Sequence, residues 1–404
     1  MPESGWVDQI KRNLIAGWAL DTDHPDQPVT IVVTVNGQAH ARVMADLPRD
    51  DARLIELLKE RIRPDLHAAM SGRYGFSIPL DPPLSVFRAH DIQVRFERSG
   101  TLLPRGTGRI AAPEHGQAPL MPLLVVAAGR SGTTVLMQHL ARHPGIVVAN
   151  PYPHEIKLMT YYADAYRVLS MGADHRRSTS PDSLLRDGYT IGFNPYHRRE
   201  LGLFTKTPDL LDDYFETTVP PILNKTFGTL LMGYYTRIQA DQGKAGARYF
   251  AEKVPPRDNA RDGARVLCGD VREILLVRDP RDILCSARAF WNTGPEAAFR
   301  NVSAMVSQLE AVHANDAGNL LLIRYEDLVT DTTGTLARLW SFLDLPPPQG
   351  QARPDEAASI PANHGTSRSL EASIGRWRAE LSAEEQARCE QAFGGFLDRF
   401  GYAR

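Results

Sequence analysis

An apolar stretch that runs directly into a glycine-rich loop and then into a helical pattern constrains the fold of this chain most. Leu123–Ala127 is followed by Ala128-Gly129-Arg130-Ser131-Gly132-Thr133-Thr134, and a helical pattern continues from Thr133 to about Ala141. Glycines permit a tight turn, and the unpaired N–H groups of a helix N-terminus together with hydroxyl donors suit an anion. The sequence therefore predicts a phosphate-binding loop rather than a plain glycine turn capped by serine or threonine.

The loop departs from the GxxxxGK[ST] pattern of ATP and GTP loops at two positions. When Gly132 is aligned with the second glycine, Ala127 stands at the first glycine and Thr133 at the lysine. Without that lysine, the β- and γ-phosphates of a nucleoside triphosphate lose their main positive partner. A P-loop ATP-dependent phosphotransferase is therefore the alternative hypothesis, and the positive charge of this loop is Arg130.

Four more apolar segments alternate with helical stretches beyond the loop. They lie at 146–149, 248–251, 273–277 and 320–324, and each precedes a turn that carries Gly, Pro, Asp or Arg. Such alternation predicts an α/β fold with a P-loop-like parallel sheet flanked by helices. Ligands bind such sheets at the carboxyl ends of the strands, so we expect the chemistry there.

The length of 404 residues exceeds what one hydrophobic core usually organises, so we expect two domains. Before the loop, β-branched runs at 29–35 and 38–44 flank Asn36-Gly37, a favoured hairpin turn, and further strands are expected at 75–80 and 91–96. A helix is expected near 51–63, and 111–119 has the composition of a linker. We predict a small β-rich accessory domain over 1–115 and an α/β domain over 116–404, with a mostly helical insertion at about 152–247.

Charge and cysteine content exclude several classes of protein. The 46 basic and 48 acidic residues nearly cancel, so no basic field favours nucleic acid. Three cysteines without metal-ligand spacing argue against a disulfide framework or a structural zinc site and fit a reducing compartment. No apolar run approaches the length of a transmembrane helix, and the N-terminus has no signal-peptide pattern. We therefore expect a cytoplasmic protein that binds no nucleic acid; the oligomeric state is left open.

Four segments carry a resemblance to a known family. Residues 129–134 resemble the 5′-phosphosulfate loop of sulfotransferases that use 3′-phosphoadenosine 5′-phosphosulfate (PAPS). The other three follow in the family's order: Arg278-Asp279-Pro280-Arg281-Asp282 continuing to Ser286, Leu322–Leu328 with Trp340–Pro346, and Ser373-Ile374-Gly375-Arg376-Trp377. From 123 to about 377 the chain is similar to PAPS-dependent sulfotransferases, in particular to bacterial members that resemble the carbohydrate and tyrosyl-protein types.

The resemblance implies a set of PAPS-binding residues and no metal cofactor. The set comprises Arg130, Ser131, Gly132, Thr133 and Thr134 around the phosphosulfate, Arg278 and Ser286 at the 3′-phosphate, and Tyr325, Ser373, Arg376 and Trp377 around the nucleotide. An arginine at a strand end and a hydroxyl in the next helix can hold one phosphate together. The alternative for Arg278 is an ion pair with Asp279 or Asp282.

The resemblance also implies catalytic roles for Arg130, Lys253 and Glu155. Fixed cations can stabilise the negative charge that develops on the leaving oxygen, and Lys253 matches a family lysine that contacts the sulfate bridge. The alternative for Lys253 is a surface lysine paired with Glu252.

The acceptor needs a general base, and two neighbouring residues compete for that role. Glu155 stands where carbohydrate and tyrosyl-protein sulfotransferases carry a catalytic glutamate, and it is our candidate. Cytosolic small-molecule sulfotransferases use histidine, which makes His154 the rival and His197 a more distant one. Glu155 could alternatively serve as a carboxylate at a helix N-terminus.

The expected function is transfer of a sulfuryl group from PAPS to a hydroxyl or amine, with a saccharide or glycoconjugate such as a polysaccharide or glycolipid as acceptor. A peptide tyrosine or small phenol is an alternative acceptor, and a non-catalytic nucleotide- or glycan-binding protein is an alternative class. The insertion is the expected acceptor-binding region. Gly5-Trp6 and Gly17-Trp18 resemble a β-rich module of bacterial glycan-modifying enzymes. Exposed tryptophans would suit glycan binding, but we expect them to be buried in a small sandwich.

Overall fold

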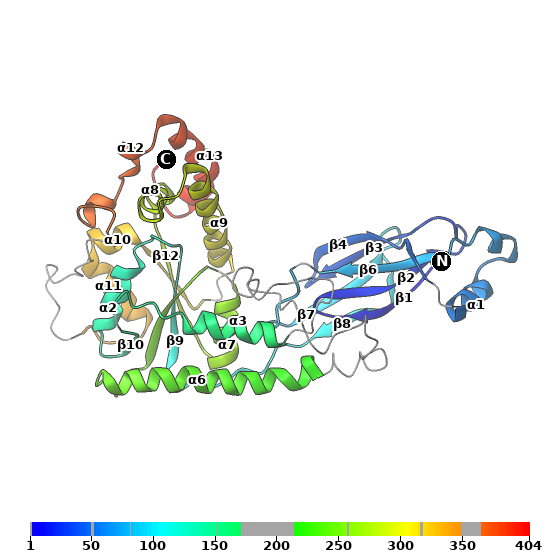
Figure 1. Cartoon of the computed structure of the whole chain (residues 1–404), viewed down its shortest axis with the longest axis horizontal. Helices are drawn as coiled ribbons and strands as arrows, with labels where there is room; N and C mark the ends of the chain where they lie inside the picture. Colours follow the sequence, from blue (N-terminus) through cyan, green and yellow to red (C-terminus); the bar gives the residue numbers. More distant parts are fainter. Residues whose placement is uncertain are drawn as a thin grey trace. The chain divides into compact units, whose positions relative to one another are not determined.

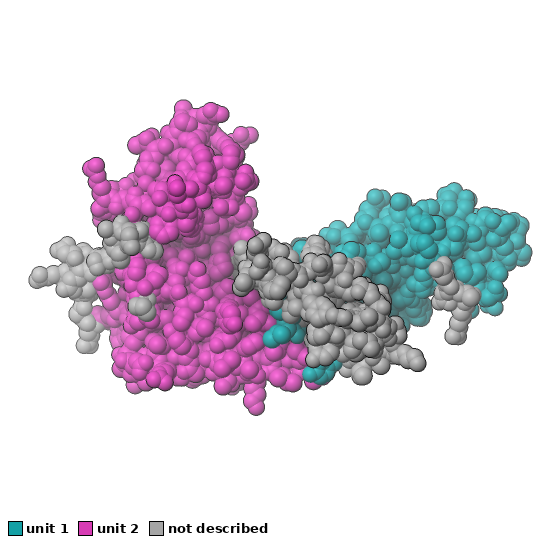
Figure 2. All heavy atoms as spheres, in the orientation of Figure 1, with its two compact units in different colours: residues 1–114, 167–216 teal, residues 115–166, 217–404 magenta. Residues whose placement is uncertain are grey.

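Antiparallel and parallel sheets occupy separate parts of this chain (Figure 1). The computed structural model describes residues 2–49, 52–80, 82–150, 152–170, 214–256, 258–315, 318–348 and 365–404. Two compact units comprise residues 1–114 with 167–216 and residues 115–166 with 217–404 (Figure 2). Within 167–216, only 167–170 and 214–216 belong to the described residues.

The first unit contains two four-stranded antiparallel sheets. One has the order β1-β2-β6-β5 and the other β4-β3-β7-β8. Their strands are β1 (Glu3–Ile10), β2 (Leu14–Asp21), β3 (Thr30–Val35), β4 (Gln38–Met44), β5 (Leu47–Pro48), β6 (Arg73–Pro79), β7 (His90–Phe96) and β8 (Leu102–Ile110). Side chains of both sheets, among them Ile15, Ile31 and Phe76, share one buried cluster. The helix α1 (Ala52–Arg61) buries Leu54 and Leu58 in a second cluster.

The predicted hairpin is confirmed, because Asn36 and Gly37 join β3 to β4 with φ of 50° and 78°. The strands β1, β2 and β8 were not predicted from the sequence. In β2, Gly17 and two alanines interrupt the strand pattern of the sequence, yet a Cβ on Gly17 would lie 2.3 Å from the carbonyl oxygen of Trp6. The expected burial is wrong for Trp6, which is 40% exposed on an outward position of β1, while Trp18 packs beside the second cluster.

The second unit is built on a five-stranded sheet in which every neighbouring pair is parallel, as the sequence predicts. Its strand order is β10-β11-β9-β12-β13. The strands are β9 (Met121–Ala127), β10 (Ile146–Val148), β11 (Tyr249–Val254), β12 (Arg272–Val277) and β13 (Leu320–Arg324). Most side chains of β9 to β12 are buried, which explains the apolar character of these strands, whereas in β13 only Ile323 is fully buried.

Helices cover both faces of this sheet (Figure 1). On one face lie α2 (Thr133–Arg142), α10 (Tyr325–Thr330) and α11 (Thr332–Phe342), whose apolar side chains join the strands in one large core cluster. On the other face lie α6 (Val219–Asp241), α7 (Asp258–Cys268) and α9 (Pro295–Ala314). The remaining helices are α3 (Leu158–Ser170), α8 (Pro280–Trp291), α12 (Trp377–Glu380) and α13 (Ala383–Arg399). The fold is therefore α/β, with helices on both faces of a parallel sheet.

Parallel pairing brings the carboxyl ends of the five strands to one edge. The loop after β9 carries Arg130, and Arg278 and Tyr325 directly follow β12 and β13. Of the insertion predicted at 152–247, the structure describes α3, a π-helical turn at Tyr214–Thr218 and α6; residues 171–213, with His197, lie outside the described residues. No helix within the described ranges is long and apolar enough to cross a bilayer.

Candidate functional site

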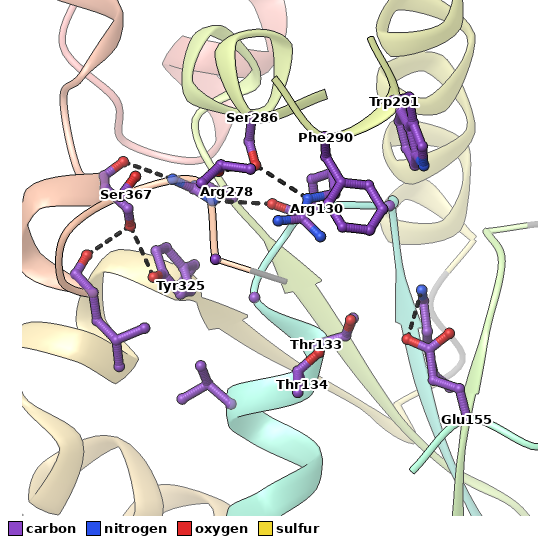
Figure 3. Close-up of a pocket in the computed structure, with 18 of the residues that line it drawn as sticks. Arg130, Thr133, Thr134, Glu155, Arg278, Ser286, Phe290, Trp291, Tyr325 and Ser367 are labelled. Atoms are coloured by element: carbon purple, nitrogen blue, oxygen red, sulfur yellow. Dashed lines mark hydrogen bonds and ion pairs between the residues drawn. The ribbon is translucent and has the colours of Figure 1, made fainter. Parts of the chain in front are cut away.

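A cavity of about 720 Å³ opens at this carboxyl edge (Figure 3). Ten of the predicted site residues line it: Arg130, Gly132, Thr133, Thr134, Glu155, Lys253, Arg278, Ser286, Tyr325 and Ser373. Lys157 and Arg368 add two further basic side chains, and Glu155 is the one carboxylate among the lining residues. With five basic groups against one acidic group, the cavity suits an anionic ligand.

The glycine-rich loop leaves the start of α2 open to the cavity. Gly132 precedes the helix with φ of 86° and ψ of 18°, and no side chain caps α2 in the described part of the chain. Thr133 and Thr134 of the first turn line the cavity (Figure 3). The hydroxyl of Ser131 is instead buried, away from the lining, with no hydrogen-bond partner among the described residues. The first turn of α2 therefore offers main-chain N–H groups and hydroxyls to an anion.

Substitution of Gly132 by alanine is expected to destabilise the protein. Its Cβ would lie 2.1 Å from the ring of Tyr325, and the left-handed backbone adds strain, so we expect a loss of about 2–5 kcal/mol. Gly233→Ala in α6, where a Cβ meets nothing within 4 Å, is the matched control and should stabilise the helix slightly. Urea unfolding measures both; equal free energies of unfolding would contradict the expectation.

Arg130 is held over the cavity by contacts from α8. Its backbone has φ of 69°, its Nε donates to Ser286 Oγ at 3.1 Å, and its guanidinium lies 4.1 Å from the ring centre of Phe290 (Figure 3). Burial, and then the nearby charge of Arg278, lower the pKa of Arg130 from its ordinary value. An anion bound between the two arginines would relieve this repulsion.

Arg278 is fixed by the main chain of two distant segments. Its Nη1 donates to the carbonyl of Arg130 at 3.0 Å and its Nη2 to that of Ser373 at 2.6 Å, while its guanidinium lies 4.5 Å from the Tyr325 ring centre. The alternative of an ion pair with Asp279 or Asp282 does not hold, because Asp279 pairs with Arg281 at 2.8 Å and both carboxylate oxygens of Asp282 accept main-chain N–H groups. The Nε of Arg278 is buried and has no hydrogen-bond partner among the described residues. Ser286 and Arg278 both bond to Arg130, Ser286 through its hydroxyl and Arg278 through Nη1 (Figure 3).

The candidate base and the candidate lysine meet in an ion pair. Glu155 Oε1 lies 3.0 Å from Lys253 Nζ, and Glu155 Oε2 lies 3.7 Å from Lys157 Nζ. His154 and Lys157, on either side of Glu155, both have left-handed backbones, with φ of 65° and 58°. The His154 ring bonds through Nδ1 to the Ala149 carbonyl at 3.0 Å and does not line the cavity. The geometry thus directs Glu155, rather than His154, into the cavity.

A different carboxylate, Glu252, sits at the start of α3. It is buried, accepts hydrogen bonds from the Tyr235 hydroxyl and from the Met159 N–H at 3.0 Å, and has its pKa raised to about 7 by burial. Lys253 therefore does not pair with Glu252, and Glu155 is not the carboxylate at that helix N-terminus. Glu252 ties the strand that carries Lys253 to the helix that follows Glu155.

The C-terminal segment contributes to the cavity unevenly. Ser373 lines it, and its hydroxyl lies 2.9 Å from that of Tyr325. Arg376 stays behind the lining and donates to the hydroxyls of Thr366 and Ser367 at 2.9 and 3.0 Å. Trp377 does not reach the cavity: its buried ring lies between Arg281 and Arg378, with guanidinium carbons 3.8 and 4.5 Å from the ring centre.

Several lining residues were missed from the sequence. Phe290 and Trp291, which are 38% and 44% exposed, end α8, and Gly365–Leu370 forms another wall. Trp291 lies on the same side of the cavity as Glu155, away from Ser367 and Tyr325 (Figure 3). The available signals were the aromatic pair at the end of the helix that carries Ser286 and the run of Thr and Ser hydroxyls at 366–369.

Comparison with known proteins agrees with this geometry. The sulfotransferase family model matches residues 122–349, more than half of the chain. The chain belongs to the sulfotransferase family. No curated protein sequence matches it. Among the described residues, no group of His, Cys, Asp and Glu side chains could hold a metal ion.

Solved sulfotransferases are similar to this family member over most of the chain. The sulfotransferase domain of the Synechococcus PCC 7002 olefin synthase is 20% identical, with a TM-score of 0.41, and the match covers 72% of this chain and 98% of that domain. Sulfotransferase STF9 of Mycobacterium avium is 14% identical, with a TM-score of 0.35 and coverages of 70% and 78%. Mouse sulfotransferase SULT7A1, complexed with PAP, is 13% identical, with a TM-score of 0.34 and coverages of 70% and 86%.

Proposed function

We propose that this protein transfers the sulfuryl group of PAPS to a hydroxyl or amine of a saccharide or glycoconjugate. The observation that carries the proposal is the meeting of Arg130, Lys253 and Glu155 at one cation-rich cavity of a sulfotransferase-family fold. Two cations and a carboxylate at the same cavity match what transfer of a sulfuryl group to an oxygen requires.

The cavity fits PAPS by its charge and its donors. PAPS carries two phosphates and a sulfate, and the lining has five basic side chains against Glu155. The uncapped first turn of α2 and Arg130 would hold the phosphosulfate, and Arg278 with Ser286 the 3′-phosphate. The buried Nε of Arg278 has no hydrogen-bond partner among the described residues, which suits a phosphate oxygen. Tyr325 and Ser373 would border the nucleotide, with Arg376 and Trp377 supporting that wall.

The chemistry divides between the residues of the chain. PAPS, when bound, supplies the sulfuryl group. Glu155 accepts the proton of the attacking hydroxyl, and Lys253, 3.0 Å away, holds this carboxylate in place by an ion pair. Lys253 and Arg130 stabilise the negative charge that grows on the leaving oxygen, and burial strengthens that effect because less water screens it.

The acceptor is proposed from the surfaces around the cavity. Phe290 and Trp291 present exposed rings at the cavity, with Trp291 on the same side as Glu155 in Figure 3, and rings of this kind pack against the faces of sugar rings as well as phenols. The first unit has an exposed tryptophan, Trp6, and we propose that this unit positions a polymeric acceptor such as a polysaccharide or glycolipid. A transfer assay with labelled sulfate across polysaccharides, glycolipids, tyrosine peptides and phenols tests this choice, and transfer to phenols alone would contradict it.

A cytoplasmic location is part of the same proposal. All three cysteines are free and buried, as in proteins of reducing compartments.

Titration calorimetry with 3′-phosphoadenosine 5′-phosphate (PAP) tests the donor. We expect PAP to bind more tightly than ATP with magnesium, because Thr133 stands where an ATP loop has its lysine. Tighter binding of ATP would overturn the proposed function in favour of an ATP-dependent phosphotransferase.

A further inference from the structure

Asp282, in the first turn of α8, holds the C-terminal segment from behind the cavity. Its side chain is buried, with Oδ2 accepting from the Gly375 N–H at 2.7 Å and Oδ1 from the Trp377 N–H at 3.0 Å. These contacts join positions 93 and 95 residues apart in sequence. Gly375 has φ of 72°, a left-handed conformation that glycine adopts without strain. With this backbone, the N–H groups of Gly375 and Trp377 both reach the Asp282 carboxylate.

The segment that Asp282 anchors also orients Arg278. The carbonyl of Ser373, two residues before Gly375, accepts the Arg278 Nη2 at 2.6 Å, and the Ser373 hydroxyl lies 2.9 Å from that of Tyr325. Because Arg278 Nη1 is bonded to the Arg130 carbonyl, the Ser373 carbonyl is the second of two fixed points for the guanidinium. If residues 373–377 moved, the guanidinium of Arg278 would lose one of these two hydrogen bonds, and its direction would be less firmly fixed.

Further contacts hold the anchored segment, and a carboxylate suits its two N–H groups better than an amide does. Arg281 and Arg378 lie against the Trp377 ring, and Arg376 reaches the lining hydroxyls of Thr366 and Ser367. Burial raises the pKa of Asp282, whereas the two N–H groups and the charge of Arg278 act in the opposite direction. An ionised carboxylate accepts from two N–H donors, whereas an asparagine offers one oxygen and turns an NH₂ group toward the second donor.

We propose that Asp282 is a positioning residue for nucleotide recognition: through Gly375 and Trp377 it fixes the Ser373 carbonyl, and thereby the direction in which Arg278 meets the 3′-phosphate. This rests on the proposed function, because the phosphate is that of PAPS. The proposal also gives Trp377 a function that needs no contact with PAPS. Its main-chain N–H binds Asp282, and its ring packs against Arg281 and Arg378.

Calorimetric titration of the full chain with PAP and with 5′-AMP, which differ only in the 3′-phosphate, tests the proposal. In Asp282→Asn we expect PAP affinity to fall about tenfold or more and 5′-AMP affinity to change less than about twofold, since one oriented charged contact is lost. Glu273→Gln is the matched control: Glu273 is equally buried and binds Arg261 at 2.7 Å at the opposite end of β12. It should lower the thermal midpoint and leave the ratio of the two affinities unchanged.

The outcomes separate the proposal from the function on which it rests. An Asp282→Asn protein that keeps the wild-type ratio of PAP to 5′-AMP affinity, even with a lower thermal midpoint, overturns the positioning role. Wild-type protein that binds PAP no better than 5′-AMP overturns the proposed donor itself, and the positioning role with it. If Asp282→Asn does not fold, Asp282→Glu replaces it. A ratio of PAP to 5′-AMP affinity that falls by about threefold or more then supports the proposal. An unchanged ratio overturns it.

Discussion

Arg130→Ala is expected to lower turnover by about 10²–10³-fold, the largest loss that we predict for removal of a positive charge. Arg130 reaches the cavity from a left-handed position of the loop and is fixed between Ser286 and Phe290. A cation held in advance in a half-buried site stabilises the developing charge without reorganisation, and alanine cannot replace it. The measurement is the rate of labelled-sulfate transfer from PAPS to an acceptor found in the screen.

Stability distinguishes this catalytic effect from damage to the fold. Because burial, and then the charge of Arg278, disfavour the charged form of Arg130, removal of the Arg130 side chain should leave the free energy of unfolding unchanged or slightly higher. Arg338→Ala serves as the control: Arg338 is exposed on α11, 4.0 Å from Asp327, and its loss should not alter turnover. Turnover of Arg130→Ala within a fewfold of wild type would show that the phosphosulfate is held by other groups.

Glu155→Gln is expected to lower turnover by about 10²–10⁴-fold while PAP affinity changes less than about twofold. Glutamine keeps the size of the side chain and an oxygen for Lys253, so the loop should retain its conformation. What is lost is the ability to take a proton from the acceptor. Transfer rate and PAP calorimetry on the same preparation measure the two effects.

The rival base gives the matched control for this result. His154→Gln removes the other candidate, whose ring bonds to the Ala149 carbonyl outside the cavity. We expect turnover within about tenfold of wild type, with any loss arising from the altered loop. Large losses in His154→Gln together with near-normal turnover in Glu155→Gln would assign the base to histidine.

Much of the fold could be predicted because its signals are local. Each strand of the parallel sheet is a short apolar run followed by a turn, and the hairpin at Asn36-Gly37 has the two residues that tolerate its positive φ angles. The strands β1, β2 and β8 were not predicted because their sequences lack such a local signal. Each of them contains one or two glycines and lacks a run of β-branched residues, and only the close approach of neighbouring strands, as at Gly17, makes glycine suitable there.

The site was predictable where a motif residue directly follows a strand. Arg278 and Tyr325 fall at strand ends, so their arrival at one edge follows from parallel pairing. Trp377 shows the limit: the motif predicts a contact with the nucleotide, yet the ring packs between Arg281 and Arg378 because α8 lies beneath it.

By itself, the sequence determined the α/β class, the glycine-rich loop between a strand and a helix, and the basic residues at the strand ends, because strand, turn and helix preferences act between neighbours in the chain. Only the tertiary structure decided that Glu155 and not His154 faces Lys253, that Ser131 is buried behind the loop, and that Asp282 holds a segment 93 residues away. Those contacts join segments that meet only after the core has packed, and their geometry follows from side-chain direction and burial, which a linear pattern does not record.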